Sequence, residues 1–231
     1  MSVALPWGTA NYNNGAIPTG AAERVGGAGT AVFTYPARGA GKCLQIAVTG
    51  DGTLGDPGYH YIPLTTPLSN AGDTLTASLV YRLTAADTAG PTRHRGFLGC
   101  SNGANSDNVS AFWDSTPSGK YRVGITTGYG PAVEVMSGYN YDLNTEYAMK
   151  LEIKVGTGSS GKARLSIDGT AVAEDLDCNT WWNGDTNRVS WYATCHKNGS
   201  LIAQFDDVLV TTANGFFVGN PWYIFMKKKK G

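Results

Sequence analysis

Residues 146–155 read EYAMKLEIKV, and residues 163–174 read ARLSIDGTAVAE. In the first stretch, apolar and charged residues alternate from Lys150 to Val155, which is the period of a strand with one buried and one wet face. In the second, Asp168 and Gly169 supply the positive φ values that a two-residue hairpin turn requires. The two stretches therefore predict neighbouring antiparallel strands that bury one face.

Similar extended runs recur along the chain between turn signals, and no stretch of ten or more residues has a clean helical period. We expect strands at 43–50, 59–66, 74–83, 95–101, 109–114, 121–127, 189–195 and 203–210. Short strands with apolar faces must close into a barrel or stack as two sheets. We predict an all-β fold, a two-sheet antiparallel β-sandwich of the jelly-roll type, as a single domain over residues 1–213.

The composition is that of a turn-rich β protein: the 231 residues include 31 glycines, 11% are aromatic and only 16% are charged. The formal charge is zero, but Lys227–Lys230 supply 4 of the 18 cations, so the rest has 14 cations against 18 acids, or −4. Nucleic acid is not an expected partner of such a body. The first residues lack the basic and apolar segments of a secretory signal. We expect an extracellular location or one on a virion or particle surface.

The order of elements towards the C-terminus is more specific. The stretches EYAMKLEIKV, ARLSIDGTAVAE and SLIAQFDDVLVTT (200–212) form a strand, a hairpin around a DG turn, and a last strand with an acid ahead of VLV. This order resembles the C-terminal half of a concanavalin A-like (laminin G-like) jelly roll, over roughly residues 70–212. The resemblance implies this fold, in a superfamily of lectins and glucanases.

Two adjacent acids interrupt the last of these strands. Simple alternation places Asp207 on the face of Phe205 and Asp206 on the face of Val208 and Val210. A buried carboxylate needs a cation, a metal or several backbone amides. The resemblance implies a structural calcium, with Asp206 as the ligand. The alternative is a β-bulge at which Asp206 or Asp207 accepts backbone N–H groups.

The known catalytic motifs of glycosidases on this fold, ExDxE and ExDxxE, are absent, and so is the GxSxG elbow of serine hydrolases. Glu174, Asp175 and Asp177 follow the predicted hairpin, and we interpret them as a solvated acidic stretch. A polysaccharide lyase is harder to exclude, because it needs only a group that neutralises a uronate carboxylate and a Tyr or His that moves a proton. Its candidate residues are Tyr192, His196, Arg93, Arg95 and His60. The motifs of the most similar alginate lyases, RxEL[RK], QIH and YFKAGxYxQ, are missing.

Aromatic residues among Asn and Asp predict a sugar site, because a pyranose stacks one face on a ring and hydrogen-bonds through its hydroxyls. The alternative is that these rings close the core. Trp113 and Trp191 lie in apolar strands and are expected in the core. The candidate ligand-binding residues are Trp181, Trp182, Asn183, Asp185, Tyr129, Tyr139 and Tyr141.

Four cysteines, Cys43, Cys100, Cys178 and Cys195, have no zinc-site spacing. The sequence leaves open two disulfides, with Cys178 and Cys195 as a plausible pair, or four buried thiols. The terminal segment 214–231 is apolar and then basic. We expect Phe216–Met226 to pair with a sheet edge or with a neighbouring copy. Pairing with a neighbouring copy would be self-assembly through this tail. Contact of this segment with a membrane surface is not expected.

Together these patterns favour a lectin-like module that binds a polysaccharide or glycan without chemistry. Two other functions stay open: a polysaccharide lyase that uses Tyr and His in β-elimination, and a structural subunit of a virion or surface layer. A structural calcium is the one cofactor expected.

Overall fold

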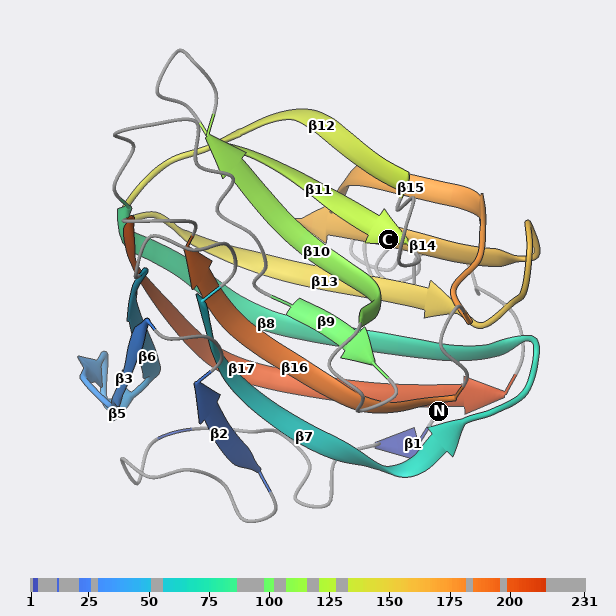
Figure 1. Ribbon diagram of the computed structural model, residues 1–231, viewed down its shortest axis with the longest axis horizontal. Helices are drawn as coiled ribbons and strands as arrows, with labels where there is room; N and C mark the ends of the chain where they lie inside the picture. Colours follow the sequence, from blue (N-terminus) through green and yellow to red (C-terminus); the bar gives the residue numbers. More distant parts are fainter. Residues whose placement is uncertain are drawn as a thin grey trace, which may run out of the picture.

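The computed structural model describes residues 2–3, 12, 21–25, 29–50, 56–86, 98–101, 107–115, 121–127, 133–181, 185–195 and 199–214. These residues form strands and turns, and no helix that could span a membrane occurs among them. The strands make two large antiparallel sheets that lie one over the other (Figure 1). The predicted two-sheet antiparallel sandwich is confirmed.

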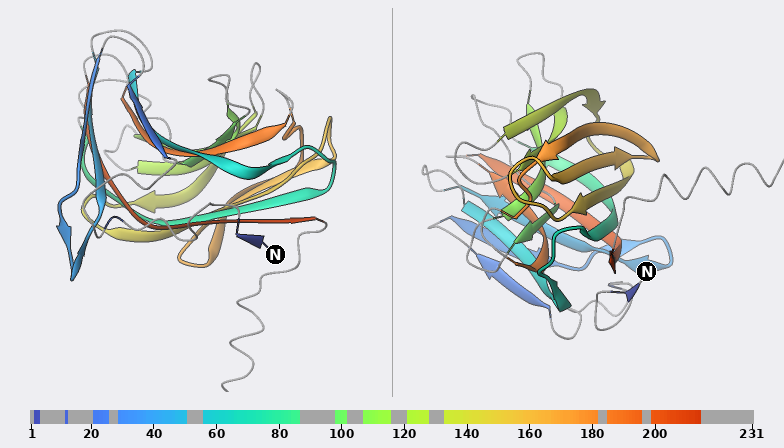
Figure 2. Two further views of the ribbon diagram at one scale, coloured as in Figure 1. Left: turned by 90° about the horizontal axis from the view of Figure 1, so that it is seen from below. Right: turned by 90° about the vertical axis from the view of Figure 1, so that its right-hand side faces the viewer.

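One sheet has seven strands within the described part of the chain. In spatial order they are β12 (Val133–Tyr141), β11 (Tyr121–Thr127), β10 (Asp107–Ser115), β9 (Leu98–Ser101), β16 (Thr186–Cys195), β7 (Asp56–Leu68) and β2 (Ala22–Val25). Figure 2 shows this sheet curving away from the other at its ends, so its outer face is concave.

The other sheet has eight strands within the same described ranges. Its order is β15 (Thr170–Cys178), β14 (Gly161–Ile167), β13 (Glu146–Lys154), β8 (Asp73–Ala86), β17 (Ser200–Asn214), β6 (Leu44–Thr49) and β3 (Thr30–Thr34), with β1 (Ser2–Val3) beside β17. A separate small hairpin consists of β4 (Ala37–Arg38) and β5 (Gly41–Lys42).

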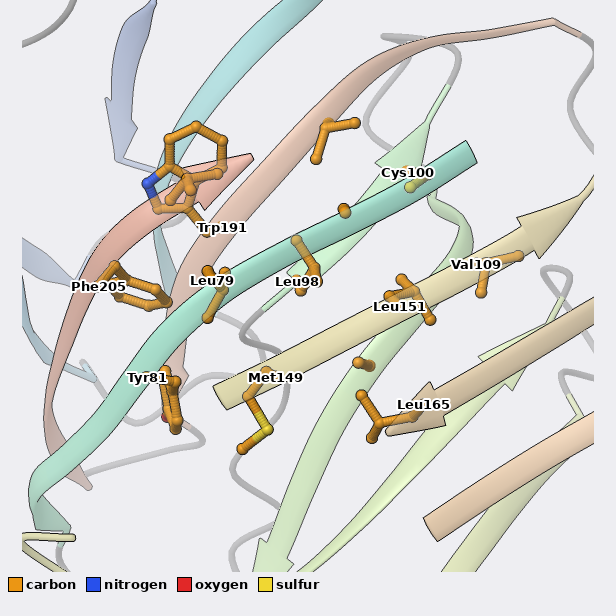
Figure 3. Close-up of a cluster of buried hydrophobic side chains, with 14 of the residues drawn as sticks. Leu79, Tyr81, Leu98, Cys100, Val109, Met149, Leu151, Leu165, Trp191 and Phe205 are labelled. Carbon is orange, nitrogen blue, oxygen red and sulfur yellow. The ribbon is translucent and has the colours of Figure 1, made fainter. Parts of the chain in front are cut away.

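The alternation in the sequence decides which side chains form the core. Along β8, every second residue from Leu75 to Leu83 is buried, and the residues between are partly exposed. Figure 3 shows side chains of both sheets meeting between them, including Trp191 of β16 and Phe205 of β17. Trp113 and Trp191 are 1% and 0% exposed, so their predicted place in the core is confirmed.

The predicted hairpin joins β14 to β15. Asp168 and Gly169 have φ values of 49° and 81°, the left-handed conformation that the turn requires. The Ala148 amide of β13 donates a hydrogen bond to Asp168 Oδ1 at 2.9 Å, which ties the turn to the third strand. Glu174, Asp175 and Asp177 follow this turn within β15, where Glu174 and Asp177 are exposed and Asp175 is partly exposed, in agreement with the predicted solvated acidic stretch.

The double acid lies at a β-bulge, as the alternative interpretation expected. Asp206 pairs with Val80 of β8, but Leu209 pairs with Ser78, so β17 contains one extra residue here. Asp207 takes the positive φ of 51°. The simple alternation was therefore wrong at this point. Val208 and Val210 share the core with Phe205, whereas Asp206 lies on the opposite face.

The four cysteines are buried thiols, so the suggested Cys178–Cys195 disulfide is not formed. Cys100, Cys178 and Cys195 belong to the hydrophobic core. Burial raises the pKa of Cys178 to about 12, and burial likewise raises the pKa of Cys43. These thiols act as small apolar side chains within the sandwich.

Candidate functional site

The outer face of the seven-stranded sheet carries polar side chains along its middle strand. On β16, Trp191 and Ala193 belong to the core, so the alternate residues Ser190, Tyr192 and Thr194 point away from it. These three are only 5%, 6% and 7% exposed. They are therefore buried groups on the outer side of the sheet that take no part in the hydrophobic core.

Strand register continues this polar face across the sheet. Ser190 pairs with Gly99 of β9, Gly99 with Ser110 of β10, and Ser110 with Thr126 of β11. Directly opposed residues share a face, so Ser190, Gly99, Ser110 and Thr126 form a row of small residues that runs across the strands. We name this row the trough. It spans three strand spacings, or about 14 Å.

Larger residues border the trough. Tyr192 lies two positions from Ser190 on β16, and Phe112 lies two positions from Ser110 on β10, so both flank the same side of the row. Phe112 is buried but lies outside the core cluster, as Tyr192 does. Gly124, the partner of Phe112 on β11, adds no side chain there. On the opposite border Arg188 pairs with Ser101.

The border with Arg188 is polar. Ser101 is buried, and nearby Asn108 is fully buried and donates a hydrogen bond from Nδ2 to Thr186 Oγ1 at 2.9 Å. The trough thus has an aromatic border and a polar, cationic border. Such an arrangement suits an amphipathic chain ligand such as a polysaccharide, which offers both apolar ring faces and hydroxyls.

Among the residues proposed for lyase chemistry, the structure places Tyr192 beside the trough. His60 is the Cα partner of Trp191 in the β7–β16 pair, and Trp191 faces the core. The side chain of His60 lies outside the described part of the chain. His196, Arg93 and Arg95 lie outside the described residues.

Of the residues predicted for the sugar site, the structure describes Trp181, Asp185 and Tyr141. Trp181 is partly buried and packs against the core, and its amide donates to Asn179 Oδ1 at 3.1 Å. Asp185 is exposed just before β16. Tyr141 is 2% exposed, with its ring centroid 4.3 Å from that of Tyr147, so it is a core residue and does not support the prediction of a sugar contact. Trp182, Asn183 and Tyr129, and the side chain of Tyr139, lie outside the described residues.

The carboxylate of Asp206 has a cation partner that the sequence did not indicate. Arg38, on the hairpin β4–β5, forms an ion pair through Nη1 with Asp206 Oδ2. The same guanidinium holds Glu146 of β13 in two hydrogen bonds, Nε to Oε1 at 2.9 Å and Nη2 to Oε2 at 3.1 Å. Asp207 Oδ2 lies 3.8 Å from Nη1. We name Arg38, Glu146 and Asp206 the arginine clamp.

The clamp lies on the outer face of the eight-stranded sheet, away from the trough. The Asp207 amide donates to Asp206 Oδ1 at 2.9 Å, so both oxygens of Asp206 have protein partners. Hydrogen bonding to Arg38 lowers the pKa of Glu146. No group of three or more His, Cys, Asp or Glu side chains within the described ranges is arranged to hold a metal. Calcium at Asp206 stays a proposal.

Sequence reasoning missed most of the trough. Ser190, Gly99, Ser110 and Thr126 are small residues of ordinary strands, and no motif marks them. The signal that identifies them is the pairing register of four strands, which connects segments far apart in the chain. Only Tyr192 was expected from its residue type and its strand.

No protein-family model matches the chain, and no curated protein matches it in sequence. Solved structures do match. Alginate lyase Aly36B is 13% identical, with a TM-score of 0.60 over 94% of this chain and 100% of that one. An endo-β-1,4-glucuronan lyase from the fungus Trichoderma reesei is 15% identical, with a TM-score of 0.59 over 92% and 96%.

The carbohydrate recognition domain of Emp47p is 8% identical, with a TM-score of 0.52 over 91% of this chain and 99% of that one. At such identities the likeness concerns the fold. The chain has the two-sheet jelly-roll fold that its sequence predicted. The fold is one that carbohydrate-binding and carbohydrate-cleaving proteins share, and function depends on the residues placed upon it.

Proposed function

We propose that the protein binds a polysaccharide chain in the trough on the outer face of the seven-stranded sheet. The observation that carries this proposal is the row Ser190, Gly99, Ser110 and Thr126, bordered by Tyr192 and Phe112. Small residues leave room for a chain that crosses the strands, while the aromatic border offers apolar contact and the hydroxyls offer hydrogen bonds.

The likeness to solved structures supports the same ligand class. Proteins with this fold and similar coverage are described as lyases of alginate and of glucuronan, and one is a carbohydrate recognition domain. On this chain Arg188, at the polar border, adds a positive charge that favours an acidic polysaccharide over a neutral one. Binding without chemistry is the function that we propose first.

Filling the trough tests its position. Ser110→Phe places a ring at the centre of the row, and we expect it to raise the Kd for alginate oligosaccharides at least tenfold, measured by calorimetry. Ser78→Phe is the matched control, because Ser78 is also a partly exposed serine on an outer sheet face, that of the eight-stranded sheet. Equal affinity in the two variants would remove the trough as the binding site.

The Trp181–Asp185 loop is the competing position for a sugar site. If the loop carries it, Trp182→Ala should weaken binding by about 1–3 kcal/mol through loss of ring burial. If the trough carries it, Trp182→Ala should leave the affinity unchanged. The two variants, tested on one ligand panel of alginate, glucuronan and a neutral β-glucan, therefore distinguish the two surfaces.

A second candidate function is β-elimination on a uronate polymer, and the place of Tyr192 favours it. As the phenolate, Tyr192 can remove the proton from the carbon next to the uronate carboxylate; a C=C bond then forms as the glycosidic C–O bond breaks, and the phenol returns the proton to the leaving oxygen. A neutralising group is also required, and we propose His196, Arg93 or Arg95 for that role. Incubation with alginate or glucuronan should then produce unsaturated ends that absorb in the ultraviolet. Tyr192→Phe should abolish this product while keeping binding; binding with no product in the unmodified protein would leave the lectin-like function alone.

A further inference from the structure

One of the four buried thiols, that of Cys43, lies outside the hydrophobic core. The residue is only 1% exposed, yet the core contains the other three cysteines and not this one. The next residue, Leu44, faces the core at the start of β6, so the Cys43 side chain is directed to the outer face of the eight-stranded sheet. There it lines a small hollow together with the three side chains of the arginine clamp. The thiol is therefore covered on the side of the clamp.

The hairpin β4–β5 leads directly into Cys43. The Cys43 amide donates a hydrogen bond to the Pro36 carbonyl at 3.1 Å, and this bond closes the base of the hairpin. Four of the six residues 37–42 are exposed. Figure 1 shows the hairpin at the margin of the sandwich, beside β6. A segment that buries so little of its surface can open locally while the rest of the protein stays folded.

Arg38 supplies charged contacts that hold this hairpin against the sheet. Its Nε and Nη2 atoms donate hydrogen bonds to Glu146 of β13, and its Nη1 atom forms the ion pair with Asp206 of β17. Hydrogen bonds between ionised groups are among the strongest in proteins. Both partners belong to the sheet, so the hairpin cannot lift away unless these bonds break.

A second arginine is placed to replace Arg38 at Glu146. Arg82 of β8 is the direct cross-strand partner of Glu146. The pKa of Glu146 is lowered first by Arg38 and in smaller part by Arg82, so both cations act on this carboxylate. The Nε atom of Arg82 is buried without a hydrogen-bond partner. A buried donor without an acceptor is unfavourable. Arg82 would therefore gain from binding the carboxylate that Arg38 now holds.

We propose that the hairpin β4–β5 is a strap with two positions, which Arg38 and Arg82 exchange at Glu146. In the closed position, which the structure shows, Arg38 binds Glu146 and the strap covers Cys43. In the open position Arg82 binds the Glu146 carboxylate, the base of the hairpin opens, and the Cys43 thiol meets solvent while the sandwich stays folded. Water then reaches Asp206 and hydrates the carboxylate that Arg38 has left. Glu146 has a cation in each position, so the strap has two discrete arrangements.

The rate at which Cys43 reacts with iodoacetamide at neutral pH measures this opening. Cys178 in the same molecules is the reference for global unfolding, and peptide mass spectrometry gives the ratio of the two rates. Arg38→Gln should raise the ratio of Cys43 to Cys178 by about tenfold or more, because the closed position loses its charged contacts. Arg82→Gln should lower this ratio by about two- to fivefold, which is the contribution of a partly exposed ion pair to the open position.

Removal of a cation also makes a nearby thiol less acidic and less reactive. The amide of Cys43 therefore supplies a second readout, because opening of the strap breaks its hydrogen bond. Hydrogen exchange of this amide, followed by NMR, should be faster in Arg38→Gln and slower in Arg82→Gln than in the unmodified protein. Arg164→Gln is the matched control, since Arg164 is an equally exposed arginine with its own ion pair on β14 and β15. It should change neither readout.

Two results would overturn the proposal. Equal acceleration of Cys43 and Cys178 in Arg38→Gln would show a general loss of stability rather than the opening of a strap. A Cys43 amide that exchanges no more slowly in Arg82→Gln than in the unmodified protein would show that Arg82 does not stabilise an open position. This second variant decides the matter even if Arg38→Gln does not fold.

Discussion

Arg38 and Asp206 form an ion pair across 168 residues of sequence, and this contact joins the hairpin β4–β5 to the bulge of the last strand. The side chain of Asp206 is only 9% exposed, so its charge depends on a nearby cation. Glu146 binds the other edge of the same guanidinium. The clamp thus links three segments, and it explains how the protein tolerates acids within an otherwise apolar strand.

Replacing Arg38 with Met should therefore destabilise the protein. Removal of the cation leaves Asp206 buried without its charged partner, and we expect the free energy of unfolding to fall by about 2–3 kcal/mol in urea titration. Arg164→Met is the control. Arg164 forms an ion pair with Glu174. The two arginine side chains are almost equally exposed, 27% for Arg164 and 26% for Arg38, but Glu174 is 35% exposed whereas Asp206 is 9% exposed. Arg164→Met should lower the free energy of unfolding by less than about 1 kcal/mol. Equal losses in the two variants would contradict the special role of the clamp.

The clamp also predicts a dependence on pH. Arg38 lowers the pKa of Glu146 below its ordinary value of 4.5 in the folded protein. The stabilisation is therefore complete above that ordinary value and is lost as the pH falls through the lower, folded value. Urea unfolding at pH 6 and below pH 4 should show a smaller loss of stability in Glu146→Gln than in the unmodified protein. An identical loss in both would show that Glu146 does not contribute.

Chelation tests the proposal of a structural calcium. A Ca²⁺ ion bound only to the folded state stabilises it by mass action, so EDTA should lower Tm and added Ca²⁺ should restore it. The effect should be larger in Arg38→Met, because Asp206 Oδ2 then has no guanidinium partner. A Tm that is unchanged by EDTA in both proteins would leave Arg38 as the cation of Asp206.

The cysteines should react as buried thiols. All four are buried, and burial raises the pKa of Cys43 and Cys178, so little thiolate is present at neutral pH. In a thiol assay without reductant, we expect slow reaction of the folded protein and four thiols per chain after unfolding in guanidinium. No reactive thiols after unfolding would indicate two disulfides instead.

Local alternation predicted the elements of this protein. The strand over 74–83 and the turn at Asp168 follow from side-chain period and backbone conformational preference, which are properties of a few neighbouring residues. The core positions of Trp113 and Trp191 follow from the same rule. For this reason the two-sheet sandwich and the order of its last strands were correctly predicted.

Tertiary structure alone decided how distant segments meet. The sequence shows that Asp206 needs compensation, but only the fold brings Arg38 to it, because the partner comes from a hairpin that no local pattern links to β17. The extra residue at the bulge reverses the alternation that would otherwise assign Asp206 to the core face. Likewise, Ser190 and Ser110 become members of one trough only through strand register. Residue type determines what a side chain can do, whereas register and packing determine which side chains act together.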